Sequence, residues 1–317
     1  MSQPSDAEKA EGPTSSPQPQ PATGQAGAPG QTGSREPVHV IGASGRSGQA
    51  VYKALRAQGT PVVPLIRNPA FASGLPGARL IDLTGPTGQL RAALADATAI
   101  VCTAHARNIP ALLAAAPPSA KLICFGSTRK FTRWPDAHGQ GVLRGEKALM
   151  ASGRTGIILH PTMIYGAQGE NNVQRLAALL RFMPVVPLPA GGKALVQPIW
   201  QGDVTASILA ALDRNWQGPK SLVIAGARAV SYRHFIELVC QAAGLKPRPV
   251  LPVPAALLMA LARLTPFLPG IPRIDPAEIR RLLEDKNFDI TPMETFLGIK
   301  PVPLEEGLAT LWPTPGL

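Results

Sequence analysis

The fold of this chain is decided by residues 38–48, whose sequence is VHVIGASGRSG. A short strand-forming run passes directly into glycines at every third position, Gly42, Gly45 and Gly48. Glycine lets the backbone turn sharply and leaves no Cβ where a phosphate has to approach. A helix predicted over residues 46–57 would point its unpaired amide groups at that anion. The junction therefore predicts a dinucleotide-binding turn.

The surroundings of this turn carry the prediction, because a glycine triplet alone is weak evidence. A second apolar strand, predicted over residues 62–66, closes a βαβ unit. An ordinary glycine-rich loop that binds nothing is the alternative, and the strand–turn–helix–strand order disfavours it.

Strands and helices continue to alternate up to residue 166. Strands are predicted at 79–82, 99–102, 121–125 and 156–159, and helices near 89–95, 109–116 and 142–151. This order predicts an α/β fold with a Rossmann-type, doubly wound parallel sheet, whose ligands gather at the carboxyl ends of the strands. Beyond it, helices are predicted over 173–182, 204–212, 232–243, 255–264, 276–284 and 305–311.

Three regions follow from this pattern. Residues 1–36 are rich in Pro, Gly, Ser, Gln and Thr, so we expect a disordered tail that cannot offset its ordering entropy. Residues 37–166 form the predicted dinucleotide-binding core. Residues 167–317 form a smaller, mainly helical substrate lobe that is partly interleaved with the core.

The charge of the chain is strongly positive, at +11 overall. The tail holds four acidic and two basic residues, so the remaining body carries +13. A basic body favours anionic partners such as nucleotides, nucleotide sugars or acidic lipid surfaces, although an Arg-rich composition alone also explains it. Basic residues cluster at 129–133, but we expect no nucleic-acid partner.

The three cysteines, Cys102, Cys124 and Cys240, lack metal-ligand spacing. They predict buried thiols in a reducing compartment and no metal site. A polar N-terminus and the lack of a long apolar run predict a cytoplasmic protein. Residues 251–271 are apolar but interrupted by Arg263, which predicts a cap helix over the substrate pocket. The alternative is a lipid-facing amphipathic lid that makes the protein membrane-peripheral.

With Arg67 at the end of the second strand, the Gly-x-x-Gly-x-x-Gly turn resembles the short-chain dehydrogenase/reductase superfamily, in particular its extended and atypical, NAD-dependent epimerase/dehydratase-like members. The resemblance covers about residues 37–311, including FLGIKP at 296–301 near the end. It implies an NAD(P)-dependent oxidoreductase or epimerase/dehydratase acting on a nucleotide sugar or a hydrophobic, lipid-like carbonyl or alcohol.

Arg67 also bears on the choice of cofactor. NAD enzymes usually place an acid there, whereas a guanidinium suits the extra phosphate of NADP. No Asp or Glu lies between Gly59 and Ile81, so NADP is preferred over NAD; Arg67 could equally stack on adenine. By resemblance, Asp82 lies near the adenine amino group, unless it is only a loop acid. The complete predicted cofactor set is Gly42, Ser44, Gly45, Arg46, Ser47, Gly48, Arg67, Asp82, Thr103 and Pro161.

The resemblance fails in part at the reaction centre. The family uses a Ser or Thr after the fifth strand, and Thr128, with Ser127 second, matches it. The family's Tyr-x-x-x-Lys pair is missing, because Tyr52, Tyr165 and Tyr232 have no Lys four residues later.

Alignment back from PTMIYG at 161–166 decides what replaces this pair. It puts Glu146 at the family's helix Glu, His138 at the Tyr position and Val142 at the Lys position. A gapped alignment would instead make Lys147 the Lys. His138 can exchange protons near neutral pH, although its loop-like surroundings at 135–139 also fit a solvent-exposed histidine.

Two function classes remain open. The first is an NAD(P)-dependent oxidoreductase with Thr128, Ser127 and His138 as catalytic candidates. The second is a non-catalytic NAD(P)-binding sensor or accessory protein, similar to the cofactor-sensing regulators and the accessory subunit of respiratory complex I that keep this fold without the pair. A serine hydrolase is not supported, because the chain has no Gly-x-Ser-x-Gly elbow.

Overall fold

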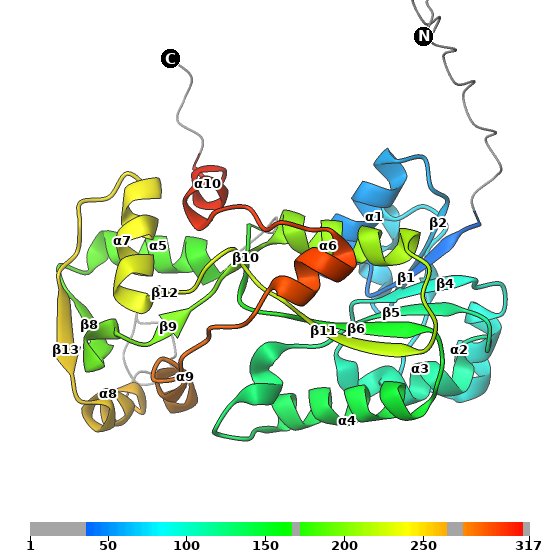
Figure 1. Cartoon of the computed structure of the whole chain (residues 1–317), viewed down its shortest axis with the longest axis horizontal. Helices are drawn as coiled ribbons and strands as arrows, with labels where there is room; N and C mark the ends of the chain where they lie inside the picture. The colour runs from blue at the N-terminus through cyan, green and yellow to red at the C-terminus, as the bar shows by residue number, and fades with distance from the viewer. Residues whose placement is uncertain (1–35, 167–171, 265–274, 313–317) are drawn as a thin grey trace, which may run out of the picture. The chain divides into compact units, whose positions relative to one another are not determined.

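The computed structural model describes residues 36–166, 172–264 and 275–312. Its centre is a seven-stranded parallel sheet in the order β11-β6-β5-β4-β1-β2-β3 (Figure 1). The strands are β1 Val38–Ile41, β2 Val62–Ile66, β3 Arg79–Leu80, β4 Ala99–Cys102, β5 Lys121–Phe125, β6 Gly156–Pro161 and β11 Pro219–Ile224. The predicted doubly wound α/β fold is confirmed.

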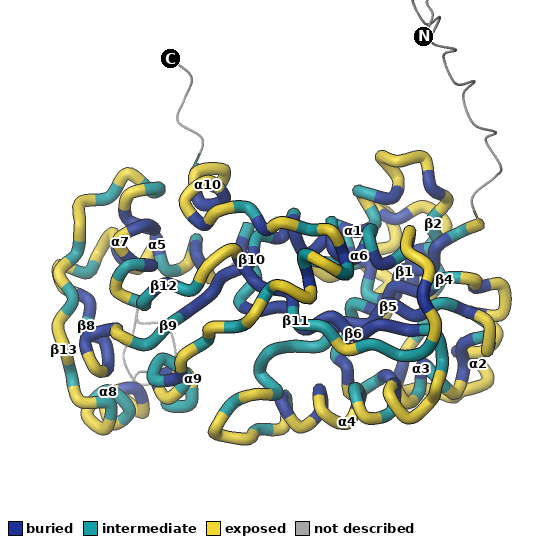
Figure 2. The backbone as a smooth tube through the Cα atoms, in the orientation of Figure 1, coloured by how far each residue is buried: buried dark blue, intermediate teal, exposed yellow. Residues whose placement is uncertain are grey.

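Helices cover both faces of this sheet, because successive strand residues point to opposite sides. Val40, Val101 and Ile123 pack in one core with helices α1 (Arg46–Ala57) and α6 (Gln201–Asp213). Ile41, Ile100 and Leu122 pack in the other, with α2 (Thr87–Leu94), α3 (Ile109–Ala115) and α4 (Ala137–Ala151). The central strands are therefore buried between two helical layers, whereas the edge strands β11 and β3 are partly exposed (Figure 2).

A smaller C-terminal lobe packs around a third core that includes Tyr165, Leu180 and Val239. It contains β7 Ile164–Tyr165, α5 Asn172–Phe182, β8 Val186–Pro189, β9 Leu195–Val196, β10 Ile199–Trp200, β12 Val230–Ser231, α7 Tyr232–Ala242, β13 Val250–Val253, α8 Ala255–Ala262, α9 Pro276–Arg281 and α10 Leu304–Ala309. Its strands pair two by two, β7 with β10, β9 with β12 and β8 with β13. The sequence did not predict these short pairs.

Several predicted boundaries were wrong. Helix α4 begins at Ala137 and not near residue 142, because the Asp136 carboxylate caps it by accepting a hydrogen bond from the Gly139 amide at 2.7 Å. The predicted loop position of His138 is therefore incorrect, since His138 lies in the first helical turn. Strand β11 was missed because it begins with Pro219 and carries polar residues, which an edge strand tolerates.

Cys102, Cys124 and Cys240 are buried free thiols, as predicted. Within the described ranges, no helix combines the length and apolar character needed to cross a bilayer. The predicted helix over 255–264 is present as α8, and β13 precedes it. The rest of the 251–271 stretch, residues 265–271, lies outside the described residues. Of the predicted disordered tail, residues 1–35 also lie outside the described residues.

Candidate functional site

A cavity of about 930 Å³ opens at the carboxyl ends of the parallel strands. Open parallel sheets bind ligands at this edge. The residues predicted to bind the cofactor all line it, namely Gly42, Ser44, Gly45, Arg46, Ser47, Gly48, Arg67, Asp82, Thr103 and Pro161. A smaller cavity of about 250 Å³ lies next to Arg67 and Asp82.

The glycine turn has the geometry that its sequence requires. Gly42 has a φ of +80°, which favours glycine, and its carbonyl accepts a hydrogen bond from the Gly45 amide at 2.8 Å. A Cβ on Gly48 would lie 2.1 Å from the Gly42 carbonyl oxygen, so no larger residue fits there. Gly45 is the N-cap of α1 and provides no side-chain cap, which leaves amide groups of the first turn available to an anion.

The wall of the cavity contains polar atoms that lack a protein partner. The Thr162 hydroxyl is buried without a hydrogen bond, and so is Nε2 of His105. His105 Nδ1 accepts a hydrogen bond from the Arg107 amide, so Nε2 of the neutral ring carries the proton and is an unused donor. Both atoms have almost no accessible surface, so they lie behind the wall of the cavity and do not face the space that a ligand would occupy.

At the end of the cavity formed by β2 and β3, Arg67 is exposed and its charge acts on Asp82. The pKa of Asp82 is lowered mainly by hydrogen bonds from the amide and hydroxyl of Thr84, and to a smaller extent by Arg67. Asp82 is therefore an ionised acceptor next to a guanidinium. This pair offers one group for a base or ribose and one for a phosphate.

The two hydroxyl candidates after β5 have different positions. Ser127 lines the cavity, and its Oγ accepts a hydrogen bond from the Arg129 amide at 3.2 Å. Thr128 is not a lining residue, and its hydroxyl donates to the Pro161 carbonyl at 3.2 Å. The sequence ranked Thr128 first, but of the two residues only Ser127 lines the cavity.

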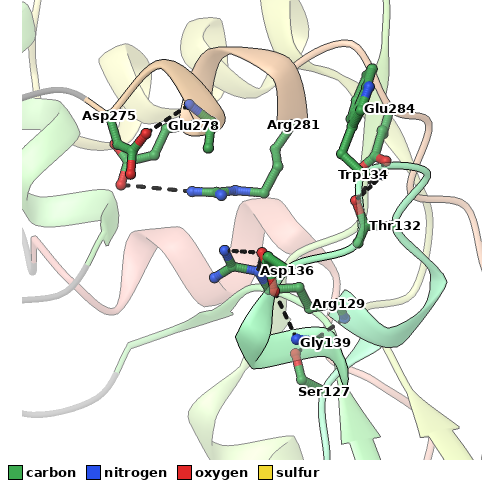
Figure 3. Close-up of polar contacts among 11 residues, drawn as sticks. Ser127, Arg129, Thr132, Trp134, Asp136, Gly139, Asp275, Glu278, Arg281 and Glu284 are labelled. Atoms are coloured by element: carbon green, nitrogen blue, oxygen red, sulfur yellow. Dashed lines mark hydrogen bonds and ion pairs between the residues drawn. The ribbon is translucent and has the colours of Figure 1, made fainter. Parts of the chain in front are cut away.

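His138 also lines the cavity, and its ring packs edge-on against His105 with 4.3 Å between ring centroids. Burial lowers the pKa of His138, and the charge of Arg129 lowers it further, while Asp136 opposes the shift. His138 is thus a neutral imidazole at pH 7. Figure 3 shows Arg129 and Asp136 at the start of α4, with Arg281 of α9 paired to Glu278.

A buried polar network contacts the backbone amide of Ser127. His160 on β6 is fully buried, and its Nδ1 accepts a hydrogen bond from the Ser127 amide at 3.1 Å. Its Nε2 therefore carries the proton and donates to the Ser221 hydroxyl at 3.1 Å. Ser221 and Lys130 both donate to the Glu146 carboxylate.

The protonation states in this network follow from burial and charge. Burial lowers the pKa of His160 to about 4, and the Lys130 ammonium acts in the same direction. Burial would raise the pKa of Glu146, but the hydrogen bonds from Lys130 and Ser221 lower it overall. The network thus contains a neutral imidazole and an ion pair, and it fixes the Ser127 peptide.

Sequence reasoning missed His160, Lys130, His105 and Thr162. Each lies at or just after the carboxyl end of β4, β5 or β6, and that position is the signal that could have found them. The gapped alignment gains no support, because Lys147 is exposed on α4 and does not line the cavity. None of the three tyrosines lines it either.

No protein-family model matches the sequence, and no curated protein matches it. Solved structures do share its fold. The NADPH-dependent quinone oxidoreductase from Escherichia coli, complexed with NADPH, is 20% identical with a TM-score of 0.67, covering 86% of this chain and 99% of that one. UDP-glucose 4-epimerase from Thermotoga maritima, with UDP-glucose, is 16% identical with a TM-score of 0.65, covering 86% and 96%. UDP-glucuronic acid 4-epimerase from Bacillus cereus, with its substrate and NAD, is 16% identical with a TM-score of 0.64, covering 86% and 96%.

The chain therefore has the Rossmann-type fold of nucleotide-sugar epimerases and of an NADPH-dependent quinone oxidoreductase. This agrees with the resemblance drawn from the glycine turn.

Proposed function

We propose that this protein is an NAD(P)-dependent oxidoreductase that acts on an alcohol or carbonyl carbon. One observation carries the proposal: a single cavity runs from the glycine turn at Gly42–Gly48 to Ser127 and His138. A dinucleotide held at the turn thus shares its cavity with a hydroxyl and an imidazole.

The catalytic roles follow from the positions of these two side chains. Ser127 would hold the substrate oxygen through its hydroxyl. The neutral ring of His138 would accept the hydroxyl proton during alcohol oxidation. When bound, the nicotinamide would accept a hydride from the carbon that carries this hydroxyl group. The alcohol would thus lose one proton and one hydride and become a carbonyl. In the reverse direction His138 would have to be protonated first.

NADP is the cofactor that the residues of the cavity favour. Arg67 and Arg46 both line it, and a guanidinium can form a bidentate pair with a phosphate. Among the residues that the structure describes, Asp82 is the only carboxylate that lines the cavity. The similar fold of an oxidoreductase complexed with NADPH supports this choice, whereas the epimerase with NAD keeps NAD as the alternative.

An anionic substrate such as a nucleotide sugar is favoured by the charges around His138. Arg129, Arg107 and Arg281 all lower its pKa, which means that three guanidinium groups act on this part of the molecule. Only Asp136 opposes them, and it is paired with Arg129. The epimerase with UDP-glucose has the same fold. A lipid-like carbonyl compound is the second substrate class, supported by the apolar surface of α8.

A non-catalytic dinucleotide-binding protein is the second candidate function. It is favoured by the lack of a tyrosine in the cavity wall, since Tyr165, for example, is fully buried in the lobe and burial raises its pKa. A phenol in that state does not exchange protons near neutral pH.

Titration with NADPH and NADH, followed by turnover assays with UDP-sugars and quinones, separates the two functions. The enzyme should oxidise or reduce one of these substrates, and Ser127→Ala should lower the rate while Thr128→Ala changes it much less. Tight binding of cofactor without turnover of any substrate would support the non-catalytic alternative. Failure to bind either dinucleotide would exclude both.

A further inference from the structure

We propose that one end of the C-terminal lobe docks on an anionic phospholipid membrane. This docking end consists of residues 172–193, which contain α5 and β8, and residues 245–264, which contain β13 and α8. The proposal does not depend on the reaction that the cavity performs.

The docking end is unusually apolar at its surface. Seven of the thirteen exposed large hydrophobic side chains of the described residues lie on it: Leu179, Phe182, Val185, Leu251, Leu257, Leu261 and Leu264. Phe182 is 86% exposed, which is a large unfavourable contact between an aromatic ring and water. Such clustering marks an interaction surface more than a random distribution of single residues does.

These side chains form helical stripes. Arg175, Leu179 and Phe182 are spaced i, i+4, i+7 on α5, on the side away from the buried Val173, Ala177 and Leu180. Leu257, Leu261 and Leu264 have the same spacing along α8 and the turn after it. The apolar side chains of both stripes are exposed to solvent, Phe182 almost completely and the three leucines of the second stripe about half.

The two segments are joined by direct contacts. Strand β13 pairs in parallel with β8, with Val250 opposite Val186, and α8 contacts β8 as well. Arg248, just before β13, donates hydrogen bonds to the carbonyls of Leu180 and Arg181 at the end of α5. β13 and α8 lie together at the outer edge of the lobe, where much of the backbone is exposed (Figures 1 and 2).

The charges of the docking end decide its partner. Its two segments contain six cationic residues, Arg175, Arg181, Lys193, Lys246, Arg248 and Arg263, and no Asp or Glu. Helix α9, which packs against α8, adds Asp275 and Glu278 but also Arg280 and Arg281, so it leaves this balance unchanged. Anionic lipids attract such a surface while its apolar side chains enter the acyl boundary. A second copy of this chain would bring six further cations against it, which disfavours self-association.

Co-sedimentation of the full chain with vesicles tests the proposal. We expect binding to vesicles of equal parts phosphatidylglycerol and phosphatidylcholine, weakened by added salt, and little binding to phosphatidylcholine alone. Lys246→Gln with Arg263→Gln should lower the partition coefficient by about 25-fold, since each surface cation contributes about fivefold. Leu257→Asn with Leu261→Asn should lower it by at least about tenfold because apolar area is no longer buried.

Helix α4 supplies matched controls, because it has exposed Leu143 and Met150 beside Arg144 and Lys147. Leu143→Asn with Met150→Asn, and Arg144→Gln with Lys147→Gln, should leave vesicle binding unchanged. An unaltered thermal unfolding midpoint and NADPH affinity would show that the docking variants are folded.

Three results would overturn the proposal. The first is no binding to anionic vesicles by the parent protein, and the second is equal binding to neutral and anionic vesicles. The third is sedimentation of the parent as a dimer that the Leu257→Asn with Leu261→Asn variant dissociates, which would assign the surface to a second copy.

Discussion

Gly45, at the start of α1, has no side chain, and the proposed cofactor site depends on this. A Cβ there would meet only the Gly42 carbonyl oxygen, at 3.2 Å, which is a tight contact that a small shift of the backbone would relieve. Gly45→Asp should abolish dinucleotide binding in a fluorescence titration, because a carboxylate would face the pyrophosphate at the start of α1. Gly45→Asn is the matched control, since both residues cap helices well and differ only in charge. Unchanged affinity in the Asp variant would refute the predicted cofactor site.

We predict that Arg67 sets the preference for NADPH over NADH. If its guanidinium holds the 2′-phosphate, Arg67→Ala should weaken NADPH by about 1–3 kcal/mol and leave NADH nearly unchanged. Calorimetric titration measures both affinities. Arg56→Ala, at the exposed end of α1, removes an equivalent charge outside the cavity and should change neither. Equal losses for the two cofactors would instead indicate stacking of Arg67 on adenine.

His138 is the residue on which the enzyme proposal depends most. His138→Gln should lower turnover by roughly two to four orders of magnitude while cofactor affinity stays constant. Because its pKa is lowered by burial and by Arg129, alcohol oxidation by the parent should stay fast at pH 6.5 and fall only as the pH drops through that lowered pKa. Steady-state rates across this range check both statements.

His234→Gln is the matched control, because this histidine lies on α7, outside the cavity, with its side chain 44% exposed. An active enzyme that is indifferent to His138→Gln would move the proton exchange to His105 or to water.

At the scale of elements, the N-terminus of α4 contributes both to the stability of the protein and to the position of His138. Asp136→Ala removes the cap and should lower the free energy of unfolding by about 1 kcal/mol. It should also lower turnover, because His138 lies in the first turn that the cap holds. Asp136→Asn keeps a capping oxygen and should retain most of both. Urea unfolding and rate measurements on the same samples test this.

Ser231→Ala removes the cap of α7, where Ser231 accepts a hydrogen bond from the His234 amide, and is the matched control. It should lower stability by a similar amount with no change in turnover. A loss of turnover as large as that of Asp136→Ala would mean that general destabilisation, and not the position of His138, explains the effect.

At the scale of the whole molecule, the buried neutral His160 makes stability depend on pH. Its pKa is about 4 in the folded protein, below the ordinary value of 6.5, so between these values the unfolded chain binds more protons than the native one. Stability is therefore full above pH 6.5 and decreases as the pH falls toward 4, by up to about 1.4 kcal/mol per pH unit from this group.

Urea midpoints at pH 7.5 and pH 5 measure this loss, and His160→Gln should reduce it because an amide keeps the acceptor for the Ser127 amide without titrating. His234→Gln should leave the loss unchanged. Equal midpoints at the two pH values in the parent protein would contradict the neutral, buried state of His160.

The sequence by itself determined the parallel α/β core and the glycine turn between β1 and α1. Both depend on local patterns: strands of four to six residues, glycines at every third position, and the helix that follows them. The lining of the cavity by Arg67, Asp82 and Pro161 followed as well, because parallel strands bring their carboxyl ends to one edge.

Only the tertiary structure decided how the rest of the site is made. In the structure, Ser127 lines the cavity and Thr128 does not. His138 lies in the first turn of α4 and not in a loop. His160 accepts a hydrogen bond from the Ser127 amide, and Lys130 donates one to Glu146 in the same network. These side chains come from elements that are distant in the sequence. Their contacts depend on helix capping, burial and the packing of α4 on the sheet, and no local pattern encodes that packing.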